Sequence, residues 1–529
     1  MIHSTRGMAV APHALAAQSA LGVLREGGNA LEAMVAAAAT IAVAYPHMNG
    51  IGGDSFWLFC APRRKPRAID ACGAAARMAS REWYAARGIT SSIPFRGGAA
   101  ANTVAGTVSG WRLAFEQSRK WGGRLPVKRL LADAIHYAEH GVAVSRSQAE
   151  NTAKKRAELE PQSGFREAFL PGGSAPAAGS LFRQPRLAAT LGRLARSGLD
   201  DFYCGKLARS IAADLAAAGS PLAADDLARH RARLVTPLAL AHSLGTIYNL
   251  PPPTQGLVSL LILGMLDALA IGRTSPQSAD YVHLAVEAAK RAFAIRDRYI
   301  TDPAYMTVRV EDLLAPARIR ALAAEVDRGR AAPGGAGRGP SDTVWMGVID
   351  GEGRAVSMIQ SIYHEFGSGV VLEGSGINWQ NRGASFSLDE RALNVLRPGR
   401  KPFHTLNPAL ALLRDGRTLV YGTMGGDGQP QTQAAVFTRI AVFGMDPQSA
   451  VAAPRWLLGG TWGETSDTLK LESRFPAGVP ATLGAYGHEV EILPEYDEAM
   501  GHAGAILRHP NGVLEGGADP RSDGAVAAY

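Results

Sequence analysis

The chain has 529 residues, of which 47% are hydrophobic and 19% are charged, values typical of a globular protein with one or two large domains. Its net charge of +8 comes from scattered side chains without a lysine- or arginine-rich run, which argues against a nucleic-acid-binding protein. Cys60, Cys72 and Cys204 are an odd, scattered set without metal-ligand spacing, which favours a reducing cytoplasm over a disulfide framework.

The amino-terminal residues contain no basic segment followed by an apolar core, so we expect no signal peptide. The longest apolar runs lie near residues 33–45 and 257–269, and both are shorter than the ~20 residues that span a bilayer. The sequence therefore predicts a soluble, cytoplasmic protein with no membrane partner.

The first helical region is interrupted by glycine. The segment "ALAAQSALGVLREGGNALEAMVAAAATIAVAYP" predicts two helices separated at Gly27 and Gly28, the second capped by Asn29 and ended before Pro46. The alanine face of that second helix requires close packing against a sheet. The next segment, "NGIGGDSFWLFCAP", predicts a turn that leads into a strand.

The middle of the chain, residues 120–330, is predicted to be mostly helical, with its clearest amphipathic helix at residues 278–300. The segment "RGRAAPGGAGRGPSD", residues 328–342, has the composition of a flexible linker. Strands follow at residues 343–350, 355–366 and 408–426, and a last helix at 432–444. Strands with covering helices on both sides predict a layered α/β sandwich.

Thr343 stands where the linker ends and the first of these strands begins. Either the loop simply ends there, or the chain is cut before Thr343, so that its hydroxyl lies beside a new free amine. The segment "TVWMGVIDGEGRAVSMIQS" predicts a hairpin. A turn centred on Glu352 would place Ser361 opposite Thr343, either as an ordinary cross-strand pair or as a second hydroxyl beside the nucleophile.

Several segments resemble the γ-glutamyltransferase family of N-terminal-nucleophile hydrolases. They are "VLREGGNALEAMVAAAATIAVAYPHMNGIGGDSFWL", "NLPPPTQG", "VHLAVEAAKRAFAIRDRYITDP", "DTVWMGVIDGEGRAVS" and "GGADPRSDGAVAAY". This resemblance implies a four-layer αββα fold and a proenzyme cleaved between Asp342 and Thr343. The products, residues 1–342 and 343–529, would stay together in one folded unit, as an αβ heterodimer or a dimer of these.

The same resemblance implies the chemistry. The free α-amine of Thr343, with a pKa of ~7.7–8.0, would accept the proton of the Thr343 hydroxyl as it attacks an amide. Ser361 falls where the family has a hydroxyl that hydrogen-bonds the nucleophile. Gly425 and Gly426 in "YGTMGGDG" match the oxyanion motif, although a Gly-Gly pair by itself favours a tight turn. No metal or other cofactor is expected.

The sequence departs from the family at the substrate pocket. The arginine that holds the glutamyl α-carboxylate is replaced by Cys72, and a pair of serines by His404 and Thr405. The positions that hold the α-ammonium are Tyr363, Arg382 and Ser385.

Arg382 would repel an ammonium group but can grip a carboxylate, so we expect a substrate that carries a carboxylate and no α-ammonium. Arg382 as a structural salt-bridge residue is the alternative.

These departures resemble the oxamate amidohydrolase branch of the family, which implies hydrolysis of oxamate to oxalate and ammonia in purine catabolism. Three alternatives remain. One is a γ-glutamyl hydrolase or transferase, another is a glutaryl or cephalosporin acylase, and the third is an uncleaved binding protein. His136 and His140 have a spacing that could bind zinc, but Gly141 follows them at once and no third ligand is evident, so we interpret them as a helix end.

Overall fold

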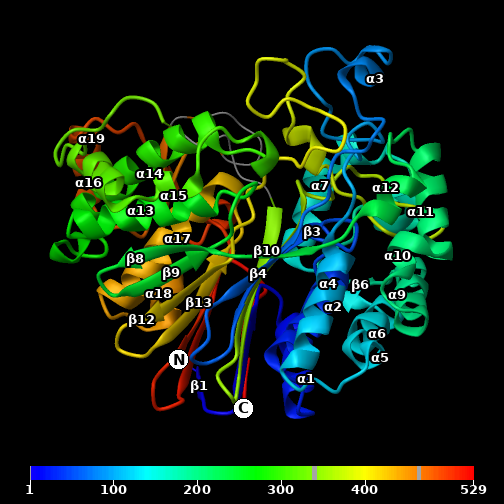
Figure 1. Ribbon diagram of the computed structural model, residues 1–529, viewed down its shortest axis with the longest axis horizontal. Helices are drawn as coiled ribbons and strands as arrows, with labels where there is room; N and C mark the ends of the chain where they lie inside the picture. Colours follow the sequence, from blue (N-terminus) through cyan, green and yellow to red (C-terminus); the bar gives the residue numbers. More distant parts are fainter. Residues whose placement is uncertain (1, 336–341, 461–465, 467) are drawn as a thin grey trace.

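A computed structural model describes residues 2–335, 342–460, 466 and 468–529 of the chain. Two seven-stranded sheets lie face to face at its centre, and helices cover their outer faces (Figure 1). This is the four-layer αββα arrangement, so the fold predicted from the sequence is confirmed. None of the described helices is both long and apolar enough to cross a membrane.

The first sheet, sheet A, lies next to the helices formed by residues 256–324 and 429–452. Its strands, in spatial order, are β1 (Ile2–Ser4), β18 (Leu514–Ala518), β17 (Ala503–Arg508), β13 (Thr418–Thr423), β12 (Ala409–Leu413), β9 (Gly245–Asn249) and β8 (Leu238–His242). The helices on that side are α13 (Gly256–Ala268), α14 (Ala279–Tyr299), α15 (Val310–Leu313), α16 (Pro316–Ala324), α17 (Gln429–Phe437) and α18 (Pro447–Ala452).

The second sheet, sheet B, contains the predicted hairpin. Its strands, in order, are β19 (Ala525–Ala528), β2 (Gly7–Ala11), β10 (Asp342–Asp350), β11 (Ala355–Tyr363), β3 (Asp54–Cys60), β4 (Arg67–Ala71) and β7 (Arg233–Val235). The helices beside it and beyond are α1 (Ala14–Arg25), α2 (Ala30–Ala44), α4 (Thr107–Lys120), α5 (Val127–Leu130), α6 (Ala132–His140), α7 (Arg146–Leu159), α8 (Phe165–Phe169), α9 (Pro185–Ser197), α10 (Asp201–Cys204), α11 (Lys206–Ala217) and α12 (Ala224–Arg229).

The remaining elements are short. They are α3 (Arg81–Ala85), α19 (Gly478–Ala485), the pair β5 (Val142–Ala143) and β6 (Leu181–Phe182), and a small sheet of β14 (Trp456–Leu458), β15 (Leu469–Glu472) and β16 (Val490–Leu493).

Helix α2 explains how sheet B is covered. Its cap is Asn29, whose side chain accepts from the N–H groups of Leu31 and Glu32, while Glu32 accepts from the Asn29 N–H in return. Every residue of the helix is buried, because small alanine side chains let it pack closely between sheet B and the outer helices. The two predicted helices and their glycine break are therefore confirmed.

Three differences from the predicted elements have local causes. Strand β11 ends at Tyr363, not residue 366, because Tyr363 and Phe366 adopt left-handed φ values of 85° and 57°. Strands β7, β8 and β9 interrupt the helical middle of the chain, and their short alternating patterns are hard to see beside long helices. The last helix, α17, begins at Gln429 and continues as a π-helix over Thr438–Val442.

Residues 328–335 of the predicted linker lie outside any helix or strand, and residues 336–341 lie outside the described residues.

Three hydrophobic cores separate the layers. The core between the sheets contains Phe56, Trp345, Ile359, Val420 and Ile506. One outer core joins sheet B to α2 and its neighbours, and the other joins sheet A to α13 and α14. Because alternate residues of a strand point to opposite faces, these cores also show which polar side chains face the space between the sheets.

Candidate functional site

Thr343 lies at the beginning of β10 and is fully buried. It shares its face with Trp345, which belongs to the core between the sheets. Across that core, Gly347 lies against Val420, and Trp345 packs on Gly422. If this facing of β10 and β13 continues by two residues, Thr343 lies near the end of β13, which Gly425 and Gly426 follow.

The β10–β11 register agrees with the predicted hairpin from Val344, which pairs with Gln360, to Ile349, which pairs with Ala355. Beyond Val344 the ladder is irregular: Asp342 pairs with Tyr363, so Thr343 stands against the two positions Ser361 and Ile362. The predicted pairing of Thr343 with Ser361 stays a prediction. On its other side Ser361 pairs with Asp54 of β3. Thr343 and Ser361 lie at the same end of sheet B, and Ser361 Oγ accepts the Tyr363 N–H at 2.8 Å.

The glycine pair forms the turn between β13 and α17. Gly425 and Gly426 have φ values of 119° and 49°, a left-handed conformation that favours glycine. Gln255, in the predicted "NLPPPTQG" motif, fixes this turn because its Nε2 donates to the Gly426 carbonyl at 2.7 Å and to the Thr405 carbonyl at 2.9 Å. Backbone N–H groups at such a turn before a helix suit the developing charge of an oxyanion.

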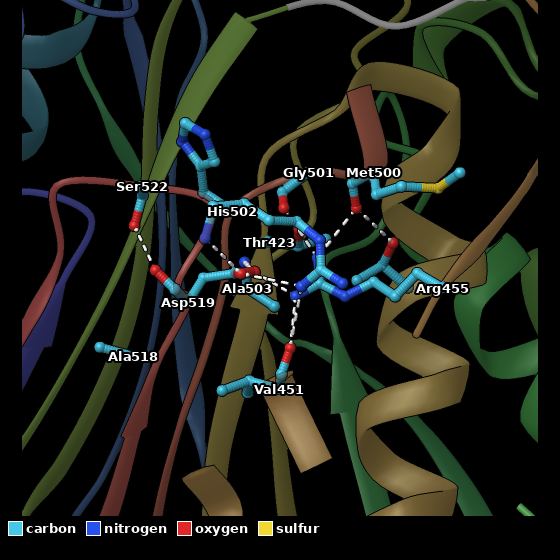
Figure 2. A network of polar contacts seen from close by, with 12 residues as sticks. Thr423, Val451, Arg455, Met500, Gly501, His502, Ala503, Ala518, Asp519 and Ser522 are labelled. Carbon is cyan, nitrogen blue, oxygen red and sulfur yellow. Dashed lines mark hydrogen bonds and ion pairs between the residues drawn. The ribbon is translucent and has the colours of Figure 1, made fainter. Parts of the chain in front are cut away.

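A buried ion pair holds Met500 and Gly501 (Figure 2), and Gly501 lies next to Gly425 of this turn. Arg455, which also binds the Asp519 carboxylate, donates from Nη1 to the carbonyls of Met500 and Gly501 at 2.8 and 2.7 Å. Gly501 packs against Met424, since a Cβ there would lie 2.5 Å from the Met424 carbonyl oxygen. The segment that supports the glycine turn is thus held by a guanidinium group and a carboxylate, both fully buried.

Four of the predicted substrate residues line one cavity of about 430 Å³: Tyr363, Arg382, Ser385 and Thr405. Arg382 is 2% exposed, its guanidinium lies 3.4 Å from the centre of the Tyr363 ring, and Nη1 donates to Thr405 Oγ1 at 3.3 Å. Its Nε has no hydrogen-bond partner among the described residues. Burial lowers the pKa of Arg382, whereas nearby Tyr363, Cys72 and Asp54 oppose that shift.

His404 and Cys72 lie outside the described lining of this cavity. The His404 ring is buried and its Nε2 hydrogen-bonds Asp54 Oδ2 at 3.0 Å. Cys72 lines a second cavity of about 760 Å³, and burial raises the pKa of its thiol. Cys72 therefore lies beside Asp54 and lines a different cavity from Arg382.

Among the residues that the structure describes, two groups of side chains have donor atoms close enough to hold a metal ion. Asp54, Cys72 and His404 are one, with donor atoms within 4.8 Å of one another. There the Asp54–His404 hydrogen bond and the nearby guanidinium of Arg382 disfavour a cation. His283, Glu287 and His488 are the other.

In that second group Glu287 is already paired with Lys290 and Arg291. The rings of His136 and His140 stack in the last turn of α6, with their centres 4.5 Å apart, which agrees with the predicted helix end. We assign no metal to any of these groups.

Sequence reasoning missed several residues around the site. Arg296 and Asp427 both line the 430 Å³ cavity and form an ion pair at 3.1 Å. Arg296 comes from α14, which shows in sequence only as an amphipathic helix, and Asp427 directly follows the glycine pair. In the sequence, Asp54 is only the last residue of "GIGGD", a segment that we predicted to be a turn before a strand.

The chain is similar to known proteins over its whole length. A family model described as gamma-glutamyltranspeptidase matches residues 16–529. An oxamate amidohydrolase proenzyme from Klebsiella pneumoniae is 60% identical over 99% of both chains. A glutathione hydrolase-like proenzyme from Bacillus subtilis, YwrD, is 40% identical over 99% of this chain and 98% of that protein.

Among solved structures, a cephalosporin acylase from Bacillus halodurans superimposes with a TM-score of 0.90 and 34% identity, covering 100% of this chain and 96% of the acylase. These relatives extend across both sheets and the candidate site, and the family model covers all of it except β1 and β2. The chain belongs to the gamma-glutamyltranspeptidase family.

Proposed function

We propose that this protein is an autoprocessed amidohydrolase that uses Thr343 to cleave the amide of a small substrate bearing a carboxylate, with oxamate as the preferred substrate. The observation that carries the proposal is that Thr343 follows Asp342, whose partner across the hairpin, Tyr363, lines the cavity that contains Arg382. The similarity to an oxamate amidohydrolase proenzyme supports the same substrate.

Processing would begin with attack of Thr343 Oγ on the carbonyl carbon of Asp342. As the acyl group moves from nitrogen to Oγ, the C–N bond between Asp342 and Thr343 would break and free the α-amine of Thr343. Water would then hydrolyse the resulting ester, which releases the carboxylate of Asp342 and the hydroxyl of Thr343. The two pieces would remain together, because β10 lies between β2 of the first piece and β11 of the second. Sheet A is likewise built from strands of both pieces.

In the mature enzyme the α-amine of Thr343 would take the hydroxyl proton as Oγ bonds to the amide carbon. The N–H groups of Gly425 and Gly426 would stabilise the oxyanion, each such donor being typically worth about 3–4 kcal/mol. As the C–N bond breaks, the protonated amine would return its proton to the leaving nitrogen, which departs as ammonia. Water would then hydrolyse the acyl-threonine ester and regenerate the hydroxyl.

Arg382 would bind the substrate carboxylate. A planar guanidinium donates two parallel hydrogen bonds to a carboxylate, and one that is buried and stacked on Tyr363 is held in a fixed orientation. An α-ammonium group would be repelled there, which disfavours γ-glutamyl substrates. Ser385 and Thr405 would complete the polar lining.

The test is ammonia release from oxamate by the purified protein and by Thr343→Ala. Release by the wild type alone, from a chain split before Thr343, is the expected result. A split chain that releases nothing from oxamate would rule out the substrate but leave the nucleophile standing, and an unsplit, inactive chain would favour a binding protein.

The cavity volume favours a second candidate. About 430 Å³ lies in the range of sites that hold drug-sized ligands, more than oxamate needs, and the similar cephalosporin acylase has the same fold. A glutaryl amide would present a carboxylate to Arg382 in the same way. Release of aniline from glutaryl anilide, compared with γ-glutamyl anilide and oxamate, distinguishes the three substrate classes.

A further inference from the structure

The segment behind the glycine turn, residues 498–502, makes polar contacts on a second side. We call it the support segment. In Figure 2 the His502 side chain points away from Arg455, which holds the segment from the other side. The His502 carbonyl accepts the Met424 N–H at 3.2 Å, directly before Gly425, and a Cβ on Gly425 would lie 3.7 Å from the backbone of the segment. The position of the glycine turn therefore depends on the position of the support segment.

Glu498 connects the support segment to the first piece of the chain, residues 1–342. Its Oε1 accepts a hydrogen bond from Ser147 Oγ at 2.6 Å and lies 3.1 Å from His502 Nε2. Ser147 is buried in the first turn of α7. Although burial raises the pKa of Glu498, the neighbouring His502 and Ser147 bring it below its usual value. The side chain is therefore a carboxylate near neutral pH, the form that accepts the stronger hydrogen bond.

His47 continues this row of contacts within the first piece. Its Nε2 lies 2.9 Å from Ser147 Oγ. The single hydroxyl proton of Ser147 points to Glu498, so His47 Nε2 has to carry a proton and donate it. Burial lowers the pKa of His47 to about 3, so the ring is neutral and its Nδ1 is unprotonated. The row His47–Ser147–Glu498 thus has one consistent set of donors and acceptors.

The same histidine also contacts the substrate side of the site. The His47 carbonyl accepts the Phe366 N–H at 2.8 Å, and Phe366 follows three residues after Tyr363, which lines the cavity. Phe366 and Glu498 belong to the second piece of the chain, residues 343–529, whereas His47 and Ser147 belong to the first. The first piece therefore bridges two parts of the second, the loop after Tyr363 and the support segment.

We propose that Glu498 is a positioning residue, which fixes the support segment, and with it the glycine turn, against the first piece through Ser147. The inference rests on the proposed function, since it requires the turn to stabilise an oxyanion. Hydrogen bonds to an oxyanion reach full strength only in the transition state, whereas the substrate carboxylate is bound elsewhere, at Arg382. Loss of the Ser147–Glu498 contact therefore lowers kcat and leaves KM nearly unchanged.

The first test compares Ser147→Ala and Glu498→Ala with the wild type. A misplacement of about 1 Å in an active site can cost about 100-fold in rate, so we expect kcat for oxamate to fall by about tenfold or more in each. Glu498→Gln keeps an oxygen that accepts from the Ser147 hydroxyl, and it should retain most of the wild-type kcat. Glu495→Ala removes an exposed carboxylate from the same loop and should match the wild type.

A double-mutant cycle shows whether the two side chains act through one contact. If they do, the double variant should be no slower than the slower of the two single variants. Losses of kcat that multiply in the double variant would overturn the proposal. A rise in KM without a loss of kcat would also overturn it, as would a loss in Glu498→Gln as large as in Glu498→Ala.

A second measurement needs no turnover. Because the Met424 N–H donates to the support segment, its hydrogen exchange reports whether the segment is held. Mass spectrometry of a peptide that contains residues 424–426 should show faster exchange in Ser147→Ala and Glu498→Ala than in the wild type and Glu495→Ala.

The exchange measurement also separates this inference from the proposed function. Unchanged exchange in the two variants of an active enzyme would refute the inference alone. If the wild type hydrolyses neither oxamate nor glutaryl anilide but the exchange still differs, the proposed function fails, while the support of the turn by Glu498 stands.

Discussion

Replacing Arg382 with alanine tests the carboxylate site directly. Its guanidinium lies on the Tyr363 ring, hydrogen-bonds Thr405 and is almost wholly buried, so water cannot replace it as a partner for a carboxylate. Removing one partner of a buried, hydrogen-bonded charge pair costs about 2–5 kcal/mol of binding free energy. At about 1.4 kcal/mol per factor of ten, kcat/KM for oxamate should fall by roughly 30- to 5000-fold, mainly through KM.

The assay compares steady-state ammonia release by the wild type, Arg382→Ala and the control Arg391→Ala. Arg391 belongs to the same loop, is 90% exposed and pairs only with Asp389 at 3.3 Å among the described residues, so its loss should change kcat/KM less than twofold. A denaturing gel should show that all three chains are split. If KM for oxamate is unchanged in a split Arg382→Ala enzyme, the carboxylate role is wrong.

Four further experiments test the site and the fold around it. Thr343→Ala should leave the chain intact on a denaturing gel and abolish hydrolysis, while Thr343→Ser should restore some of both; cleavage of the alanine variant would contradict the nucleophile. Gln255→Leu leaves two buried carbonyl groups without their donor, at about 1–3 kcal/mol each, so kcat should fall at least tenfold while the chain still folds, as judged by circular dichroism. Gly422→Ala places a Cβ 2.1 Å from Trp345 and should destabilise the protein by about 1–3 kcal/mol, lowering Tm, whereas Gly478→Ala meets no atom within 4 Å and should not. Burial lowers the pKa of His47 from 6.5 to about 3, so its stabilisation is complete above pH 6.5 and is lost as the pH falls towards 3; Tm should drop from pH 7 to pH 4, and by less in His47→Gln.

The elements that sequence predicted best are those with local signals. Asn29 and its glycine neighbours mark a helix boundary, and the pair Gly351–Gly353 marks a hairpin whose register is correct from Val344 onward. The pattern did not predict the irregularity beyond Val344, where Asp342 pairs with Tyr363, a residue with a φ of 85°. Short strands such as β8 and β9 were not predicted, because an alternation over five residues is hard to distinguish from the surrounding helical pattern.

The candidate site likewise combines residues that the sequence predicted with residues that only the fold brings together. Tyr363, Arg382, Ser385 and Thr405 came from the family register and do share one cavity. The pairing of Arg296 with Asp427 could not be predicted, because these residues meet only when α14 packs beside the glycine turn.

Asp54 is a non-local case of another kind. It becomes a neighbour of Ser361 only through the β3–β11 register, which connects residues more than 300 positions apart in the chain.

The ladder around β10 suggests why processing and substrate binding can be separated by mutation. Pairing with β11 is regular from Val344, and pairing with β2 involves Gly347 to Asp350, so both lie beyond the bond before Thr343. Among the described strand pairings, the one that cleavage there would affect is that of Asp342 with Tyr363, and Tyr363 carries the ring on which Arg382 stacks. In the uncleaved chain Arg382 is already stacked on Tyr363 and lines the cavity, so we expect both the nucleophile and the carboxylate site to hold their places before and after cleavage. Arg382→Ala should then be processed at the wild-type rate, and oxalate should bind the intact Thr343→Ala chain as well as it binds the mature enzyme.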